Sequence, residues 1–335
     1  MFTAPRQLEW REVPPPALTS DRAALVRPTA VATCDLDALI ISGSSPFAPP
    51  FAIGHECVAE VVDVGDAVAT VRPGDAVSVP FQISCGECGA CRSGRSGNCE
   101  SVPFMSTYGF GPAVEQWGGF FSDLACVPHA DHMLVPLPDG VAPAALASAS
   151  DNLSDAWRAV GPPLAQEPGA AVLVVGGASS GSIGLYAAAL AIALGAASAL
   201  YVDGDEARSR IAAGFGAQTL TEKPKRLGPF PITVDSSADA AGLRLALRST
   251  APDGICTSTA IYFGEQPELP LLEMYTKGIT FRTGRVHARE AMPNVIELAA
   301  SGSLHPELVT TRTVAWDDAP DALRECDWTK LVVER

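Results

Sequence analysis

The stretch VLVVGGASSGSIGL, at residues 172–185, is a run of four apolar residues that enters a glycine-rich turn and then an alanine-rich segment. A short apolar run bounded by turn residues predicts a buried strand, and the segment beyond the turn predicts a helix. Further short apolar runs alternate with helical patterns as far as about residue 283. Strands that alternate with helices across short loops predict a parallel, doubly wound sheet, an α/β fold.

The expected strands of this sheet are VLVV, ALYVD, ITVD, ICTSTA and ITFRT, at residues 172–175, 199–203, 232–235, 255–260 and 279–283. The segments ARSRIAAGFGA and AAGLRLALRST lie between them and predict helices.

The chain before about residue 150 differs in composition and in hydrophobic pattern. It is rich in Val, Pro and Gly, and its alternating runs, such as ECVAEVVDVG and DAVSVPF, predict strands and turns of an antiparallel β region. The tail after about Pro293 holds one more helical pattern, at 294–301, and the strand-like LVVE. We predict a β-rich domain over residues 1–155, a doubly wound domain over 156–292, and a tail, 293–335, that returns to the first domain.

Length and charge narrow the possible functions. A chain of 335 residues exceeds what one hydrophobic core usually supports, so about two domains are expected. The 38 acidic and 23 basic side chains give a net charge of -15, which repels phosphate backbones and anionic lipid. We therefore expect no nucleic-acid and no membrane partner. The N-terminal MFTAPRQLEWREVPPP lacks the features of a signal peptide, which predicts a cytoplasmic protein.

The glycine-rich turn is a candidate dinucleotide site. Its glycines are Gly176, Gly177, Gly181 and Gly184, and Ser182 and Ile183 begin the expected helix. The N-terminus of a helix that follows such a turn receives a pyrophosphate group. The turn departs from G-x-G-x-x-G by about two extra residues, and an ordinary strand–helix junction is the alternative interpretation.

A carboxylate, Asp203, ends the next expected strand, 19 residues beyond Gly184. A carboxylate at this place accepts hydrogen bonds from the ribose hydroxyls of NAD and repels the 2′-phosphate of NADP. The pattern therefore predicts NAD as the cofactor. Arg208 lies five residues further on, and it either reads a phosphate or lies on a solvated helix face.

The segment CGECGACRSGRSGNC places Cys85, Cys88, Cys91 and Cys99 at the spacing C-x2-C-x2-C-x7-C. Zinc binds four thiolates as a tetrahedron, and a glycine-rich loop lets one short segment wrap around the ion. Two disulfides among cysteines three residues apart are the alternative, but they would be strained and unexpected in a reducing compartment. We predict a closed, structural zinc site.

A second set of ligand types is spread along the chain, with Cys34 in ATCDLD, His55 in IGHEC and Asp151 in SASDNLSDAW. Singly, these residues have ordinary interpretations as a buried thiol, a hydrogen-bonded imidazole and a helix N-cap. Together they supply one thiolate, one imidazole and one carboxylate and leave a fourth position for substrate, which is the arrangement of a catalytic zinc.

From about residue 5 to its end, the chain resembles the zinc-containing medium-chain alcohol dehydrogenases. The resemblance is carried by GHE before a strand, the four-cysteine lobe after VPF, the glycine turn at 176–184 and WDDAPDAL near the end. The run VPFQISCGECGAC and the carboxylate at Asp151 are most similar to the bacterial branch of formaldehyde dehydrogenases and tetrameric secondary-alcohol dehydrogenases. The resemblance implies a GroES-like catalytic domain, a Rossmann domain, and a homodimer or homotetramer.

The resemblance also assigns roles to further residues. Asp151 matches the third ligand of the catalytic zinc in that branch, and Glu56 matches a residue behind the zinc that exchanges as a ligand. Asp37 matches a carboxylate that orients the ligating histidine. By the same resemblance, Thr259 in CTSTAI is expected beside the nicotinamide carboxamide, and Arg285 is expected at the pyrophosphate.

The chain departs from the family pattern near Cys34. A hydroxyl residue two positions after the cysteine and a histidine five positions after it are replaced by Leu36 and Leu39, and position 35 is Asp35. The usual proton relay is therefore missing. Asp155 lies four residues after Asp151, so if the segment is helical both carboxylates share one face, about 6 Å apart at Cβ. We predict that Asp155 is the general base, with an acid in the first helical turn as the alternative.

These features together predict a zinc-dependent oxidoreductase that transfers a hydride between an alcohol, or an aldehyde or ketone, and NAD(H), with zinc as a Lewis acid on the substrate oxygen. The alternatives are a zinc-independent double-bond or iminium reductase on the same scaffold, which Leu36 favours, and a nucleotide-binding protein without redox turnover.

Overall fold

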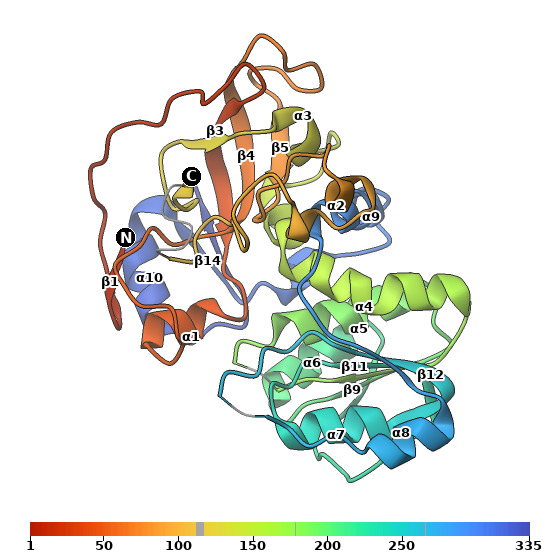
Figure 1. Cartoon of the computed structure of the whole chain (residues 1–335). Helices are drawn as coiled ribbons and strands as arrows, with labels where there is room; N and C mark the ends of the chain where they lie inside the picture. The colour runs from red at the N-terminus through yellow and green to blue at the C-terminus, as the bar shows by residue number, and fades with distance from the viewer. Residues whose placement is uncertain (112–116, 178, 265) are drawn as a thin grey trace. The chain divides into compact units, whose positions relative to one another are not determined.

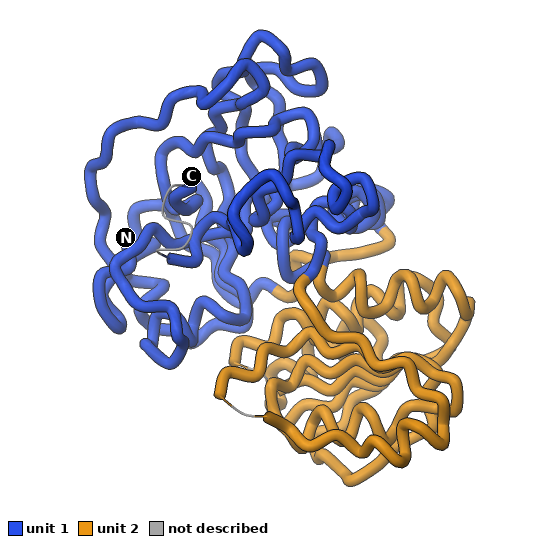
Figure 2. The backbone as a smooth tube through the Cα atoms, viewed as in Figure 1, with its two compact units in different colours: residues 1–154, 286–302, 310–335 blue, residues 155–285, 303–309 orange. Residues whose placement is uncertain are grey.

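The computed structural model of the chain describes residues 1–111, 117–177, 179–264 and 266–335. The described residues divide into two compact units, which Figure 2 shows in different colours. Unit 1 contains residues 1–154, 286–302 and 310–335, and unit 2 contains residues 155–285 and 303–309. The domain boundaries at 155 and 292 stay predictions, because compactness alone does not show which segments fold independently.

Unit 1 is built on a sheet of seven strands among its described residues. They are β14 (Arg312–Ala315), β15 (Leu331–Glu334), β3 (Ala24–Ala32), β4 (Glu56–Val64), β5 (Ala76–Val79), β7 (Val135–Pro136) and, beside β3, β6 (Ala125–Val127). β14 and β15 are parallel, and the other described pairings in this sheet are antiparallel. The prediction of an antiparallel β region before residue 150 is therefore confirmed.

The helical segments of unit 1 are short, apart from the 13-residue α9. They are α1 (Asp37–Ser42), α2 (Gly89–Arg92), η1 (Ser96–Asn98), α3 (Ala130–Met133), η3 (Pro143–Ser150), α9 (Ala288–Ala300), η5 (Trp316–Asp318) and α10 (Ala319–Glu325). Strands β1 (Phe2–Ala4) and β2 (Gln7–Leu8) form a small separate pair. In β3, buried positions alternate with more exposed ones as far as Ala30, because one face of the strand packs on the apolar core.

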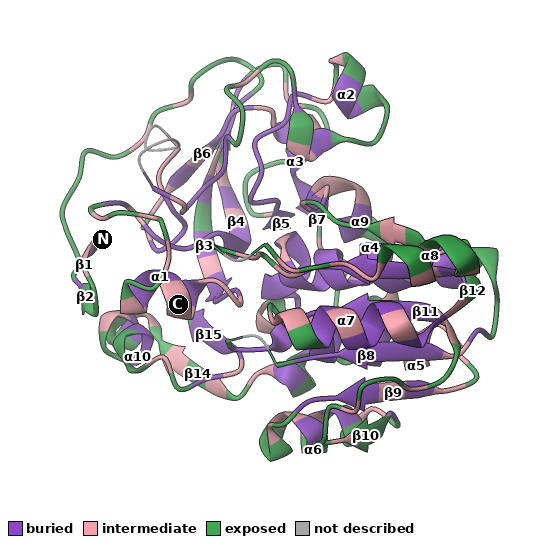
Figure 3. Cartoon of the chain, turned by 60° about the horizontal axis from the view of Figure 1, so that its bottom comes forward, coloured by how far each residue is buried: buried purple, intermediate pink, exposed green. Residues whose placement is uncertain are grey.

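Unit 2 is a parallel sheet with the strand order β10-β9-β8-β11-β12-β13 among its described residues. The strands are β8 (Val172–Val175), β9 (Ala199–Val202), β10 (Gln218–Leu220), β11 (Phe230–Asp235), β12 (Thr250–Ser258) and β13 (Thr280–Arg282). This order confirms the predicted doubly wound sheet. β8 is buried at every position, as expected of a strand covered on both faces (Figure 3).

Helices cover both faces of the sheet in unit 2. α5 (Ser182–Ala193) and α6 (Glu206–Gly214) pack against β8, β9 and β10, while α7 (Ala240–Ser249) and α8 (Leu271–Lys277) lie on the other face against β11 and β12 (Figure 1). α4 (Asn152–Gln166) begins in unit 1 and continues into unit 2, and η4 (Pro306–Val309) belongs to unit 2.

The sequence patterns missed β10, because QTL is three residues long and contains no apolar run. Among the described residues, no helix is both long enough and apolar enough to span a bilayer.

Candidate metal centres and dinucleotide site

Two groups of metal-ligating side chains converge among the described residues. The first is formed by Cys34, His55 and Asp151, whose ligand atoms all lie within 4.8 Å of one another. Cys34 lies between β3 and α1, His55 lies just before β4, and Asp151 lies between η3 and α4. The three residues predicted to hold the catalytic zinc therefore meet in unit 1, although 117 positions separate the first from the last.

A glycine brings His55 to this place. Gly54 has φ of +99°, and a Cβ atom there would lie 2.9 Å from the backbone nitrogen of Phe121. Both the left-handed backbone and the close approach require glycine. The GHE motif therefore has a local structural reason as well as a chemical one.

The surroundings of the three side chains suit a divalent metal ion. Cys34 and His55 are buried, and burial lowers the pKa of His55, which favours the neutral imidazole that binds metals. Nε2 of His55 lies 3.3 Å from Oδ2 of Asp151, yet neither ring nitrogen has a hydrogen-bond partner among the described residues. Such a nitrogen, beside a thiol and a carboxylate, fits zinc.

Electrostatics favour a cation here. Burial raises the pKa of the Cys34 thiol well above its usual value, and the nearby carboxylates of Asp37 and Asp151 raise it further. The backbone N–H of Leu36 donates a hydrogen bond to Cys34 Sγ at 3.1 Å, and this bond lowers the pKa of the thiol. A bound Zn²⁺ would stabilise the thiolate.

Asp37 lies beside both Cys34 and His55, while its role in orienting the histidine stays a prediction. Its Oδ2 accepts a hydrogen bond from the backbone N–H of Cys34 at 2.7 Å, and its Oδ1 lies 3.9 Å from His55 Nδ1. Phe110 stacks at a tilt on the His55 ring, with ring centroids 4.2 Å apart. The imidazole is thus bordered by a carboxylate on one edge and an aromatic ring on its face.

Glu56 is outside the group of ligand atoms that converge. Its Oε2 pairs with Lys330 Nζ at 2.8 Å, and its Oε1 accepts the backbone N–H of Asn152 at 3.0 Å. Lys330 and Glu56 are both fully buried. Exchange of Glu56 as a metal ligand stays a prediction. Lys330 was not predicted, since a single lysine before the tail strand carries no sequence signal of burial.

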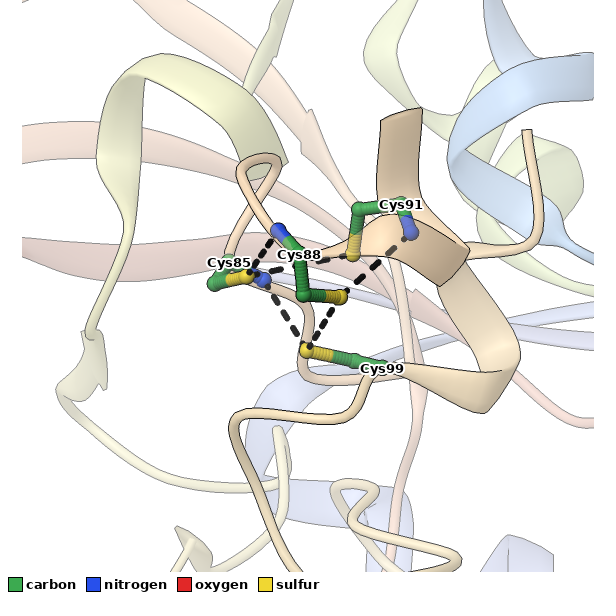
Figure 4. A group of neighbouring side chains, drawn as sticks. All are labelled: Cys85, Cys88, Cys91 and Cys99. Atoms are coloured by element: carbon green, nitrogen blue, oxygen red, sulfur yellow. Dashed lines mark hydrogen bonds between the residues drawn. The ribbon is translucent and has the colours of Figure 1, made fainter. Parts of the chain in front are cut away.

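The second group consists of Cys85, Cys88, Cys91 and Cys99, which point toward a common centre (Figure 4). The Sγ atoms of Cys85 and Cys91 lie 4.0 Å apart, and those of Cys88 and Cys99 lie 3.9 Å apart. These separations are about twice a disulfide bond, and all nine cysteines are free.

Backbone N–H groups point at the sulfur atoms of this lobe. Cys88 Sγ accepts hydrogen bonds from the N–H groups of Cys91 and Glu100, both at 3.4 Å, and these bonds lower the pKa of Cys88 to about 6. Such bonds stabilise thiolates, the form that binds zinc. The four residues fit the predicted structural zinc.

The lobe is attached to the chain segment that leads into α9. The side-chain amide of Gln82, which is buried, donates to the carbonyl of Val286 at 2.8 Å and accepts the N–H of Ala288 at 3.2 Å. Ser96 donates to Glu290 at 2.5 Å. These contacts join residues about 200 positions apart, and no sequence pattern indicated them.

The glycine turn of unit 2 begins where β8 ends, and Ala178 within it lies outside the described residues. Gly177 and Gly181 have φ of +119° and +77°. A Cβ atom at Gly184 would lie 3.3 Å from the Tyr201 ring, so this glycine allows α5 to pack closely on the sheet. Ser182 and Ile183, which were predicted to bind the cofactor, are the first residues of α5, and their contact with a cofactor stays a prediction.

Asp203 follows β9, but its carboxylate is already bonded within the protein. Oδ2 accepts hydrogen bonds from the Tyr201 hydroxyl and from Nε of Arg208, both at 2.7 Å. Oδ1 accepts from the Asp205 N–H and from Nη2 of Arg208, both at 3.0 Å. Arg208 is thus a largely buried partner of Asp203 and does not lie on a solvated helix face. The contacts of Asp203 and Arg208 with a cofactor stay predictions.

Two other predicted cofactor residues lie in unit 2. Thr259 follows β12, and its Oγ1 shares a 2.9 Å hydrogen bond with Ser236. Arg285 is the last residue of the main segment of the unit and is partly buried. Their contacts with a dinucleotide stay predictions.

Asp155 is in the first turn of α4, while Asp151 stands just before the helix, which begins at Asn152. The prediction that both lie on one helical face is therefore not met at Asp151. Asp155 forms an ion pair with Arg158, whose Nη2 donates to the carbonyl of Gly284 at 2.7 Å. The general-base role stays a prediction, and the ion pair gives Asp155 a second role, that of holding Arg158.

Comparison with known proteins places these sites in context. A family model described as the alcohol dehydrogenase GroES-like domain matches residues 20–139. The probable zinc-binding alcohol dehydrogenase Rv1895 of Mycobacterium tuberculosis is 30% identical over 318 residues, which cover 91% of this chain and 79% of the relative. A glutathione-independent formaldehyde dehydrogenase of Pseudomonas aeruginosa is 30% identical over 224 residues, covering 63% of this chain and 55% of that protein.

Among solved structures, the alcohol dehydrogenase TADH from Thermus sp. ATN1 is 28% identical and superposes with a TM-score of 0.87. The match covers 99% of this chain and 98% of that chain. The fold is therefore shared over the whole length of both proteins.

We predict about two zinc ions per chain in the purified, untreated protein, because both ligand groups are complete. Mass spectrometry under non-denaturing conditions counts them. Cys34 should resist alkylation until the metal is removed, whereas Cys126, a partly exposed cysteine of neither group, should react throughout. A single zinc, together with rapid alkylation of Cys34, would refute the catalytic site.

Proposed function

The chain belongs to the zinc-containing medium-chain alcohol dehydrogenase family, and we propose that it transfers a hydride between an alcohol, or an aldehyde or ketone, and NAD(H). The observation that carries the proposal is the convergence of Cys34, His55 and Asp151 within 4.8 Å. Three protein ligands leave one position of a tetrahedral ion for substrate, which separates this group from the closed four-cysteine lobe.

A zinc ion held by Cys34, His55 and Asp151 would supply Lewis-acid polarisation of the substrate oxygen, and a bound nicotinamide would supply or accept the hydride. The chain's own side chains prepare the metal site. Asp37 fixes the backbone of Cys34 and faces the His55 ring, and Phe110 covers that ring. Burial of Cys34 and His55 keeps bulk water from the ligands and strengthens their interaction with a cation.

The test of this function is oxidation of primary and secondary alcohols in the presence of NAD, followed at the absorbance of the reduced nicotinamide. We expect turnover that is lost when a chelator removes the zinc held by Cys34, His55 and Asp151 and is recovered when zinc returns. Asp151→Asn should lower turnover by at least about a hundredfold, because it weakens a metal ligand. Turnover that survives complete removal of zinc would favour the zinc-independent reductase instead.

We propose NAD as the preferred cofactor, since Asp203 places a buried carboxylate at the end of β9. Titration by fluorescence should show NAD binding at least about tenfold more tightly than NADP, equivalent to about 1.4 kcal/mol. Asp203→Asn should reduce this ratio, whereas the exposed control Glu206→Gln should not. A wild-type preference for NADP would identify Arg208 as the reader of the 2′-phosphate.

We propose Asp155 as the general base. Because Asp155 also pairs with Arg158, a variant of Arg158 distinguishes a general base from a residue that only positions Arg158. A general base typically accelerates a reaction by about 100- to 10,000-fold. Asp155→Asn should therefore lower turnover by at least about 100-fold while zinc stays bound. Arg158→Gln should cost much less. If the two variants lose turnover equally, Asp155 serves only to hold Arg158, and if neither does, it is a helix residue.

A further inference from the structure

The side chain of Lys330 contacts chain segments that carry the candidate metal ligands. Its Nζ donates to the main-chain carbonyl of Thr33, the residue before Cys34, and lies 2.8 Å from Oε2 of Glu56, the residue after His55. Lys330 itself lies just before β15. One buried ammonium group therefore joins the segments of two ligands.

The third ligand is reached through Glu56. Its other oxygen, Oε1, accepts the backbone N–H of Asn152, the residue after Asp151, at 3.0 Å. Thr33, Lys330, Glu56 and Asn152, which we call the Lys330 network, thus include the chain neighbour of each candidate ligand. All four residues belong to unit 1 and are buried.

Burial of this pair is not explained by stability alone. Both side chains are inaccessible to solvent, and removing two charges from water offsets most of their mutual attraction. Apolar residues of similar volume at such places are often as stabilising or more so. A fully buried ion pair beside three ligand segments therefore suggests a role in arranging them.

We propose that Lys330 is a positioning residue for the catalytic metal. It holds the backbone before Cys34 and the carboxylate after His55 at fixed places, and through Glu56 it fixes the backbone after Asp151. It also keeps Glu56 engaged away from the converging ligand atoms, so that three protein ligands, and not four, define the site. This inference rests on the proposed metal site but assigns a residue outside it.

The test is the zinc affinity of each site, measured by competition with a chromogenic chelator and by mass spectrometry under non-denaturing conditions. Loss of a residue that supports metal ligands typically costs 10- to 100-fold in metal affinity. Lys330→Met should therefore weaken binding of one zinc by about that factor and leave the four-cysteine zinc unchanged. Cys34 should become alkylated correspondingly faster.

Two further variants separate positioning from charge balance and from folding. In the double variant Lys330→Met with Glu56→Gln, no buried charge is left unpaired, so the chain is expected to fold. Its zinc affinity should stay about tenfold or more below wild type, because the contact with Thr33 is still missing. Lys277 provides the matched control, since its Nζ also pairs with a glutamate and with two main-chain carbonyls, but in unit 2.

Lys277→Met should lower the thermal midpoint without changing either zinc affinity. Wild-type zinc affinity in the double variant alone would show that Lys330 only neutralises Glu56. Wild-type zinc affinity in both the Lys330→Met single variant and the double variant would refute the inference. A wild-type protein that holds only the four-cysteine zinc would instead refute the proposed function itself. The failures of the two ideas are thus distinguishable.

Discussion

The burial of acidic groups around one imidazole is the constraint on which unit 1 depends. Cys34, Asp37 and Glu56 are buried, Asp151 is nearly so, and burial raises the pKa values of the first three. Negative charge at this density in a low-dielectric interior requires cations. Lys330 supplies one positive charge from the C-terminal tail, and a divalent metal held by Cys34, His55 and Asp151 would supply two. The tail therefore contributes to the site through an ion pair as well as through the pairing of β15 with β3.

The segment from Phe81 to Cys85 physically connects the two candidate metal centres. At one end, the Phe81 ring meets the His55 ring edge-on at 5.8 Å, and its N–H lies 3.5 Å from the carbonyl of Ser150, the residue before Asp151. At the other end, Cys85 is one of the four candidate ligands of the lobe. Gln82 ties the middle of this segment to the chain before α9. A structural zinc in the lobe would thereby stiffen the backbone that packs on the catalytic ligands, without touching them.

The parts that could be predicted from sequence are those with local chemistry or a family pattern. The four cysteines lie within fifteen residues, so their spacing alone predicted the lobe, whereas Cys34, His55 and Asp151 required the family resemblance because their spacing has no period. Lys330 could not be predicted, since its partner Glu56 is 274 positions away and a buried lysine has no local signature. A shared helical face for Asp151 and Asp155 was predicted only if both residues were helical, and this condition is not met because α4 starts at Asn152, one residue after Asp151.

The glycine turn shows why a motif can depart from its family pattern. A Cβ atom at Gly181 would lie 2.8 Å from Cδ of Arg208, and one at Gly177 would lie 2.9 Å from Nζ of Lys223. These glycines therefore make room for the protein's own cations. Asp203 in turn holds Arg208 across the turn with two hydrogen bonds. A ribose bound here would meet a carboxylate–guanidinium pair and not a lone carboxylate. The proposed discrimination between NAD and NADP would therefore depend on how firmly Asp203 keeps Arg208 in place.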